Sequence, residues 1–250
     1  MIISKKLKKY KFITHGFFNS IGGVSKGNYK SLNCGPGSKD NKNYIRSNLK
    51  IVCRKIGCNY KNLILLNQVH GDKFYYINKI PKRKKTGDGL ITKKNKIALG
   101  ILTADCAPVI ILDNSKKIIA VAHAGWKGAY KNIVLKIVKY LIKNGSRKNN
   151  LITIIGPAIS KNNYEVKSDF KRKFVNQSKN NKKFFNLKMN KIYFNLPEYI
   201  KNQLKCFGIH NIETIKKDTF DKKNKFFSAR RSIKEKKSDY GRNISIIMIK

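Results

Sequence analysis

The chain has 250 residues, enough for one domain with a substantial buried core, and its 41% apolar content is ordinary for a folded protein. No apolar run reaches about 18 residues, and the basic N-terminus lacks the apolar segment of a secretory signal, so we expect no membrane span and a cytoplasmic location. The net charge is +43, yet 48 of the 56 basic residues are Lys spread along the whole chain, which argues against a specific nucleic-acid reader.

In the first third of the chain, apolar and aromatic residues at 10–18 predict a strand that leads into a glycine turn. Apolar residues at helical spacing over 44–56 predict a helix, and Gly57 is its expected C-terminal stop. Two further apolar runs, at 62–69 and 74–80, predict strands.

The middle of the chain carries three short apolar runs, at 97–102, 109–112 and 118–122, which predict buried strands. Between the first two, residues 104–107 are expected to form a turn or a brief helix, because the proline that follows disfavours helix at the residue before it. Apolar residues on one face predict a helix over 129–143.

In the last third, residues 151–155 predict a strand that ends at a Gly-Pro pair. Helices are predicted over 165–187, with weak amphipathic character, and over 196–207, where a proline stands at an early helical position. Residues 212–215 and 244–249 predict strands, and the second of these is apolar throughout and therefore expected in the centre of its sheet.

Strands and helices alternate, but not regularly. We therefore predict a single domain over residues 1–250 of the α/β or α+β class, with mixed β-sheets sandwiched with helices. Neither a G-x-G-x-x-G nor a P-loop motif occurs in the chain, so the common nucleotide-binding glycine loops are absent.

Two histidines and one cysteine each stand at the end of an apolar run and before small residues: His70 in Gln-Val-His-Gly, Cys106 in Thr-Ala-Asp-Cys and His123 in His-Ala-Gly-Trp. Any one of them alone would more often be a packed core residue. The chain has only four histidines and five cysteines, so their joint placement is informative. Zinc accepts imidazole and thiolate ligands, and a reactive zinc site keeps three protein ligands and one open position. The three residues therefore predict a zinc site.

These motifs occur together with other blocks in a fixed order. The further blocks begin at His15 (His-Gly-Phe-Phe), Gly22 (Gly-Gly-Val-Ser), Gly87 (Gly-Asp-Gly-Leu-Ile-Thr), Gly156 (Gly-Pro-Ala-Ile), Tyr164 (Tyr-Glu-Val) and Phe226 (Phe-Phe-Ser-Ala-Arg-Arg). With them, almost the whole chain resembles the YfiH or laccase-domain family, also called multicopper polyphenol oxidoreductases and now described as purine nucleoside phosphorylases. The three ligand-bearing blocks together are highly specific for that family.

The resemblance implies a mixed α/β sandwich with His70, Cys106 and His123 as metal ligands. It also implies phosphorolysis of purine nucleosides (adenosine, inosine, guanosine and methylthioadenosine), with phosphate as co-substrate and adenosine deamination as a second activity. Zinc is the expected metal. Copper is reported for the family but is disfavoured here, because four histidines cannot fill the centres of a multicopper oxidase.

Asp105 and Cys106 are the candidate catalytic residues. Asp105 can orient a ligating histidine or act as a general acid or base, or it can simply cap the turn. Asp88, between two glycines, is either a turn former or a catalytic group. Gln68 is a polar residue in an apolar run and is a candidate hydrogen-bond partner for substrate.

Other candidate substrate contacts are cationic or lie beside cations. Arg230 and Arg231 stand out because Arg is scarce in this chain, and a guanidinium forks onto phosphate in a way that Lys does not. Ser228 adds a hydroxyl to the same segment, and a further arginine follows a little later in Tyr-Gly-Arg. Lys127 stands where the family block usually continues with Arg. The lysine keeps the positive charge but lacks the paired N–H groups of a guanidinium.

Two other classes of function stay open. Cys106 can serve as a thiolate nucleophile with His70 or His123 as its base, which describes a Cys/His hydrolase. The high positive charge also fits a basic module that binds nucleic acid or other anions, although no aromatic-interleaved arginine motif supports it. We expect a monomer that binds purine nucleosides and phosphate, with no specific nucleic-acid partner.

Overall fold

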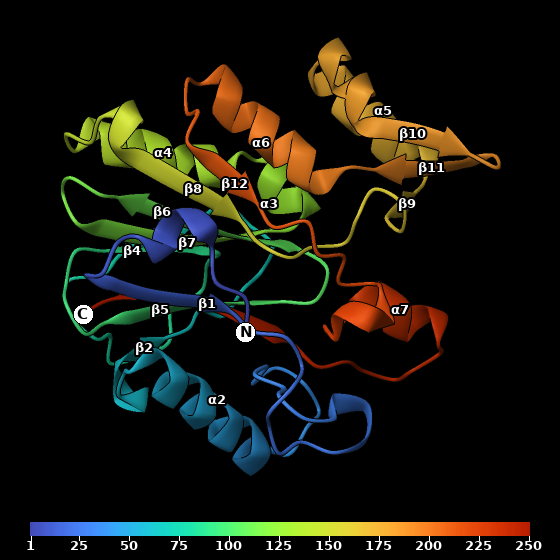
Figure 1. The fold of residues 1–250 in the computed structure, drawn as a ribbon. Helices are drawn as coiled ribbons and strands as arrows, with labels where there is room; N and C mark the ends of the chain where they lie inside the picture. Colours follow the sequence, from blue (N-terminus) through green and yellow to red (C-terminus); the bar gives the residue numbers. More distant parts are fainter.

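Two β-sheets stacked face to face form the centre of the computed structural model, which describes residues 1–250 (Figure 1). The larger sheet has six strands in the order β12-β8-β6-β7-β4-β3, and the smaller has four in the order β1-β13-β5-β2. The larger sheet consists of Ile212–Thr214, Leu151–Ile155, Ala107–Asp113, Ile118–Ala124, Gly89–Thr92 and Phe74–Tyr76, in that order. The smaller consists of Ile13–Phe17, Asn243–Ile249, Ala98–Thr103 and Leu63–Ile64. Parallel and antiparallel neighbours occur in both, so the sheets are mixed, as predicted.

Helices cover the outer face of each sheet, which gives four layers (Figure 1). On the larger sheet lie α3 (Trp126–Tyr130), α4 (Ile133–Lys143) and α6 (Leu196–Cys206). On the smaller sheet lies α2 (Lys42–Ile56). The remaining helices are short or peripheral: α1 (Lys5–Lys8), α5 (Ser168–Gln177) and α7 (Ala229–Lys234). None of the helices combines the length and apolar character needed to span a bilayer.

Strand β7 shows why the central strands are apolar throughout. All seven of its residues are buried. Ile118 and Ala120 pack with the helices on one face, whereas Ile119 and Val121 pack between the two sheets on the other. Because successive side chains of a strand point to opposite faces, a strand covered on both sides must be apolar at every position.

Several predicted elements are confirmed with boundaries close to those expected. Helix α2 begins after Asn41, whose side chain accepts a hydrogen bond from the amide of Asn43, and ends at Gly57, whose φ is +76°. Strand β13 lies between two neighbours in its sheet, as its apolar sequence predicted. The sheets and helices form a single α/β domain of the predicted class.

Several predicted elements were wrong in extent; the strand expected over 74–80, for example, is only Phe74–Tyr76. The strand expected over 62–69 is only Leu63–Ile64, because the following residues bond to other loops instead of a neighbouring strand. The helix expected over 129–143 is broken at Asn132, whose φ is +62°. The segment 165–187, expected to be one helix, begins with a short strand, β9 (Glu165–Val166), and ends in another, β10 (Phe185–Lys188). Only α5 between them is α-helical.

The strand β10 was missed in the sequence because the hairpin turn that follows it contains no glycine. It pairs with β11 (Lys191–Phe194) in a hairpin that projects from the body of the molecule (Figure 1). The two residues at the tip, Met189 and Asn190, both have positive φ, +47° and +57°. This backbone matches the right-handed twist of a hairpin, but without a glycine the turn leaves little signal in the sequence.

His15 makes a pH-dependent contribution to the stability of the fold. It lies on β1 with 4% of its surface exposed, and its Nε2 accepts a hydrogen bond from the Ser4 amide at 3.0 Å. Burial lowers the pKa of His15 to about 4, and the nearby Glu213 carboxylate only partly opposes that shift. The folded state therefore holds a neutral imidazole.

We expect the free energy of unfolding to fall as the pH is lowered from 6.5 to 4. In that window the unfolded chain binds a proton at this histidine and the folded chain does not. The contribution of His15 is about 3 kcal/mol across the window. His15→Gln, which can still accept from Ser4, should reduce the pH dependence of urea unfolding measured at several pH values. His210→Gln, at an exposed position, is the matched control, and an unchanged pH dependence in His15→Gln would contradict the assignment.

Candidate metal centre

Cys106 and His123 are brought together by two neighbouring antiparallel strands. Cys106 lies in the turn that carries the chain from β5 of the smaller sheet to β6 of the larger, and Asp105 in that turn has a φ of +85°. His123 lies on β7 directly opposite Pro108 of β6. Of the turn or brief helix predicted at 104–107, the structure shows a turn over 104–106, and Ala107 already belongs to β6. Cys106 and His123 meet where these strands of the larger sheet end.

His70 reaches the same place from a loop, between β2 and β3, and not from the end of a strand. The loop is held by the buried carboxylate of Asp88, which accepts hydrogen bonds from the amides of Val69, His70 and Gly71 at 3.3, 3.0 and 2.7 Å. His70 itself has a φ of +57°. Three amides pointing at one carboxylate fix this backbone conformation, which a non-glycine residue adopts only when its surroundings enforce it.

The same carboxylate also orients His123. Nδ1 of His123 lies 2.8 Å from Oδ1 of Asp88, and the His123 amide donates to the Asp88 carbonyl at 2.7 Å. A carboxylate on Nδ1 leaves Nε2 of the ring available as a metal ligand. Burial opposes ionisation of Asp88, but the hydrogen bonds from His123 and the Gly71 amide outweigh it and hold the carboxyl pKa below its usual range.

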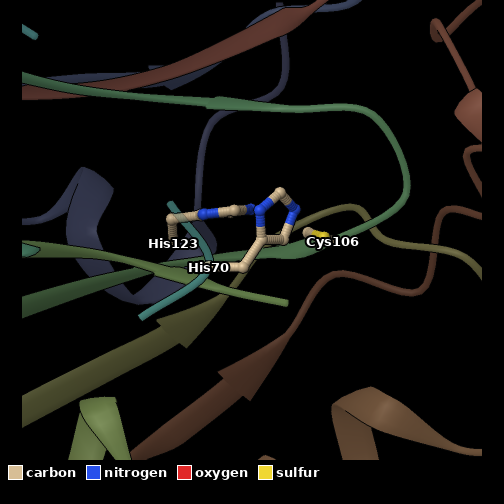
Figure 2. Close-up of side chains that lie close together, drawn as sticks. All are labelled: His70, Cys106 and His123. Carbon is tan, nitrogen blue, oxygen red and sulfur yellow. The ribbon is translucent and has the colours of Figure 1, made fainter. Parts of the chain in front are cut away.

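The donor atoms of His70, Cys106 and His123 all lie within 4.8 Å of one another (Figure 2). Ligands on one tetrahedral zinc ion stand about 3.5 Å apart, given zinc–nitrogen and zinc–sulfur bonds of about 2.1 and 2.3 Å. The spacing and the nitrogen and sulfur donors therefore fit a zinc ion with small adjustments. His70 is exposed whereas His123 is buried, so an ion held by them would retain access to solvent or substrate on one side.

The backbone passes this cluster so closely that only glycine fits there. A Cβ at Gly125 would lie 2.8 Å from the Cys106 sulfur and 2.9 Å from Cδ2 of His70. Gly125 has a φ of −69°, so it is required here for space and not for an unusual backbone angle. The glycine in the His-Ala-Gly-Trp block is thus part of the centre.

Cys106 and His123 polarise each other. Burial raises the pKa of the Cys106 thiol, but the charge of His123 and hydrogen bonds from both histidines outweigh it and lower that pKa to about 7. Burial likewise lowers the pKa of His123, but the Cys106 charge and the Asp88 hydrogen bond raise it to about 9. A thiol that ionises this readily is a ready metal ligand or nucleophile.

The cluster opens into a cavity of about 330 Å³, near the lower end of the range typical of small-molecule sites. Its lining includes all three candidate ligands, the loop Gly35-Pro36-Gly37, and apolar side chains such as Leu66 and Leu102. Gln68 also lines it, and exchanges two hydrogen bonds with the backbone of Leu102, at 2.7 and 2.8 Å. The candidate substrate contact Gln68 is therefore both in the cavity and part of its support.

Asp105 lies beside Cys106, but its carboxylate is directed to the C-terminal part of the chain. It accepts hydrogen bonds from the hydroxyls of Thr219 and Ser228, at 2.7 and 2.9 Å, and from the Arg230 amide at 2.7 Å. Burial raises its pKa, although these hydrogen bonds oppose the shift. The carboxylate that orients a ligating histidine is Asp88.

The other predicted substrate contacts lie outside the cavity lining. Ser228 is buried and caps α7 by accepting from the Arg231 amide. The Arg231 guanidinium donates to the carbonyls of Thr219 and Phe220, both at 2.8 Å, and to that of Phe226. The Arg230 guanidinium donates to the Glu165 carbonyl at 2.9 Å. Lys127 is exposed, with its ammonium 5.7 Å from the centre of the Trp126 ring.

Two cationic residues line the cavity, of which Arg242 was noted in the sequence only as a second arginine site and Lys84 was missed. Arg242, in the Tyr-Gly-Arg segment, lines the cavity together with Tyr240. Lys84 comes from the basic run at 81–85, which reads as a solvated loop by its sequence. The scarcity of Arg was a usable signal for the first, whereas nothing distinguished Lys84 from the lysines around it.

The fold and the site define the class: an α/β domain of two stacked mixed sheets with a His-Cys-His centre at the edge of one of them. Over residues 14–250 the chain matches the family described as multi-copper polyphenol oxidoreductase laccase, and it belongs to that family.

Relatives and solved structures agree with this assignment. The chain is 37% identical to a purine nucleoside phosphorylase of Rickettsia conorii, over 76% of this chain and 79% of the relative. It is 30% identical to a purine nucleoside phosphorylase of Bacteroides thetaiotaomicron, over 100% of this chain and 96% of the relative. The crystal structure of the hypothetical protein YfiH of Bacillus licheniformis superposes with a TM-score of 0.88 at 28% identity, covering 97% of this chain and 95% of that one.

Replacing Asp88 by Asn should weaken metal binding. The Asp88 carboxylate accepts hydrogen bonds from three backbone N–H groups and from His123, and the single oxygen of an Asn side chain cannot accept from all four. Both histidines therefore lose their fixed orientation. We expect zinc affinity, measured by competition with a chromophoric chelator, to fall about 10- to 100-fold. Asp72→Asn in the same loop, where the carboxylate pairs with Lys136, should leave it unchanged, and equal affinities in the two variants would refute this role of Asp88.

Gly125→Ala should disturb the centre without altering the backbone. The added methyl group would crowd the Cys106 sulfur and the His70 ring, so one of the two ligands must move. We expect at least a tenfold loss of zinc affinity, and overpacking of about 1–3 kcal/mol measured by urea unfolding of the metal-free protein. Gly37→Ala, where an added Cβ meets nothing within 4 Å, is the control. Normal zinc affinity in Gly125→Ala would show that the ligands are not held at this spacing.

Proposed function

We propose that the protein is a zinc-dependent purine nucleoside phosphorylase acting on adenosine, inosine, guanosine and methylthioadenosine. The observation that carries the proposal is the His70, Cys106 and His123 cluster opening into a small-molecule cavity, in a chain 30–37% identical to proteins named purine nucleoside phosphorylase. Zinc fits the two imidazoles and one thiolate of the cluster.

In phosphorolysis a phosphate oxygen attacks C1′ of the ribose, the bond from C1′ to the purine nitrogen breaks, and the base leaves with the bonding electrons. The reaction needs the phosphate held beside the sugar and the negative charge of the leaving base stabilised. Zinc, when bound, supplies a Lewis acid in the cavity. The chain's own contribution is positional: Asp88 sets the orientation of His123 and the conformation of the His70 loop.

The candidate catalytic and substrate residues take different parts in this proposal. Cys106 acts as a ligand. Asp105 acts as a positioning residue, because three hydrogen bonds tie its carboxylate to the C-terminal segment and so fix the turn that presents Cys106. Gln68 contacts substrate from the cavity wall. The substrate-binding roles of Lys127, Ser228, Arg230 and Arg231 stay predictions.

Adenosine deamination is the second reaction proposed for the same cavity. It replaces the 6-amino group of the purine by oxygen from water, and needs the same Lewis acid but no phosphate. The two reactions are therefore distinguished by their products and by their dependence on phosphate.

Oxidation of phenols by several copper ions, which the family description names, has less support from the residues. The cluster offers three ligands, and the other two histidines stand apart from it: His15 is buried against Ser4, and His210 is exposed. Multicopper centres need more imidazole ligands than this. We therefore propose zinc as the resident metal.

A Cys/His hydrolase is the second candidate, and one observation favours it. Cys106, His123 and Asp88 lie in the order of a nucleophile, a base and a carboxylate that orients the base, and the pKa of the Cys106 thiol is lowered to about 7. Such an enzyme would work without metal and would be inactivated by iodoacetamide. A zinc-dependent activity that zinc protects from alkylation would instead support the phosphorylase.

The phosphorylase proposal is tested by incubating zinc-loaded protein with adenosine, with and without phosphate, and separating the products by chromatography. We expect adenine and ribose 1-phosphate only when phosphate is present, and at least a 100-fold lower rate for His123→Ala, because that variant loses a ligand held by the buried Asp88. His210→Ala, at an exposed position, is the matched control.

Other outcomes of the same experiment would reassign the activity. Inosine formed at a rate independent of phosphate would identify a deaminase. No turnover of adenosine, nor of inosine, guanosine or methylthioadenosine incubated in the same way, would overturn the proposal and leave the Cys106 hydrolase as the leading candidate.

A further inference from the structure

We infer that Arg242 and Lys84 form an oxyanion subsite in the cavity of the metal centre, and that this subsite takes inorganic phosphate. Its assignment as the site of the co-substrate rests on the proposed phosphorylase function. The subsite itself rests on the charge, packing and hydrogen bonding of the cavity wall.

The lining of the cavity holds two cationic side chains and no carboxylate. Among the fifteen residues that line it, Lys84 and Arg242 carry a positive charge and none is Asp or Glu. Lys84 is exposed and Arg242 is paired with Asp239, which lies outside the lining, but two cations that face one cavity lined by no carboxylate favour an anionic ligand.

Arg242 is held rigidly before any ligand arrives. Its side chain packs against Gly35, where an added Cβ would lie 2.9 Å from the Arg242 Cδ, and its guanidinium stacks on Tyr240 at 4.0 Å. Its Nη1 donates to Oδ1 of Asp239 at 3.0 Å and to the Tyr240 carbonyl. Because the ring and the glycine fix the plane of the guanidinium, little further ordering is needed to bind a ligand.

The hydrogen bonds of Arg242 leave some of the N–H groups of its guanidinium without an acceptor. All of those made by its guanidinium use Nη1, so Nε and Nη2 have no acceptor in the protein. Arg231 differs, because its guanidinium already donates to three backbone carbonyls from both terminal nitrogens. Of the two, Arg242 is the one with donors available to an oxyanion, which an arginine binds through parallel N–H groups.

Lys84 reaches the cavity from a segment tied to the His70 loop. Its neighbour Lys85 accepts a hydrogen bond at its carbonyl from the Asn67 amide at 2.9 Å, and the Gly87 amide donates to the Asn67 carbonyl at 3.0 Å. The Lys84 ammonium forms no salt bridge with any carboxylate of the chain, and partial burial lowers its pKa. A bound dianion would supply the missing partner.

The ligand that matches these groups is a compact tetrahedral oxyanion. The guanidinium and the ammonium come from segments about 160 residues apart, so a ligand must present oxygens in more than one direction to meet both. Phosphate does so. Two sources share this chemistry, inorganic phosphate and the 5′-phosphate of a nucleotide, and we assign inorganic phosphate because the cavity also has to admit a nucleoside.

The test compares Arg242→Gln and Lys84→Gln with Lys82→Gln, an exposed residue of the same loop that lies outside the cavity lining. Phosphate binding to zinc-loaded protein is measured by calorimetric titration with inorganic phosphate, and the KM for phosphate and for adenosine are measured separately. We expect each cavity variant to weaken phosphate binding and raise the phosphate KM about 10- to 100-fold, as loss of a charge-assisted hydrogen bond predicts. The adenosine KM should change less than about twofold.

Lys84→Arg should restore the phosphate affinity that Lys84→Gln loses, because it restores the positive charge. A merely structural role of Lys84 would not predict that result. Lys82→Gln should behave as wild type, which separates the subsite from general attraction by the net charge of +43. An unchanged phosphate affinity and KM in both cavity variants would overturn the inference while leaving the phosphorylase proposal intact. Loss of phosphate binding in both variants of a protein that turns over no nucleoside would support the subsite and refute the phosphorylase.

Adenosine 5′-monophosphate is the last probe. If both cavity variants lose affinity for this nucleotide while inorganic phosphate binds them as it binds wild type, the 5′-phosphate is the ligand and the assignment to inorganic phosphate is wrong. If the nucleotide competes no better than adenosine does, inorganic phosphate is supported.

Discussion

The geometry of the candidate metal centre depends on one buried carboxylate. Asp88 accepts hydrogen bonds from three consecutive amides of the His70 loop and from Nδ1 of His123, and it has no surface exposed to solvent. Moving the loop away would leave a buried charge with unpaired oxygens, which costs several kcal/mol. Because Asp88 directly precedes β4, a strand inside the larger sheet, the position of both histidines follows from the packing of that sheet.

A second carboxylate performs the corresponding task for the cysteine. Asp105 has a positive φ, an arrangement that costs about 1 kcal/mol or more for a residue other than glycine. Its bonds to Thr219, Ser228 and the Arg230 amide offset that cost and join the Cys106 turn to the start of α7. The third ligand is therefore fixed by contacts between segments more than 100 residues apart, since Thr219 and Asp105 are separated by 114 positions.

The sequence predicted the elements whose signal is local. Strands β6, β7 and β13 are buried on both faces, so they appear as uninterrupted apolar runs, and α2 carries its own capping residue and terminal glycine. His70, Cys106 and His123 were selected as candidate ligands because each follows an apolar run, and their donor atoms do lie within 4.8 Å of one another.

What the sequence could not predict depends on contacts between distant segments. The run at 62–69 is as apolar as a strand, yet most of it is a loop, because Gln68 bonds to Leu102 and Asn67 to Lys85 in place of a strand neighbour. The roles of Asp88 and Asp105 were open for the same reason. Two aspartates in turns look alike until their partners are known, and both here bind groups on other segments.

The arginines show how local geometry matters more than total charge. Surface charges are screened by salt within about 8 Å at physiological ionic strength, so a net charge of +43 attracts anions without selecting among them. Arg230, Arg231 and Arg242 all belong to the C-terminal part of the sequence, and each guanidinium bonds to backbone carbonyls or stacks on a tyrosine. A lysine, with a point charge and no planar group, could not replace these contacts. Of these three arginines only Arg242 lines the cavity, and selectivity for an anion there depends on such a fixed, planar cation more than on the total charge.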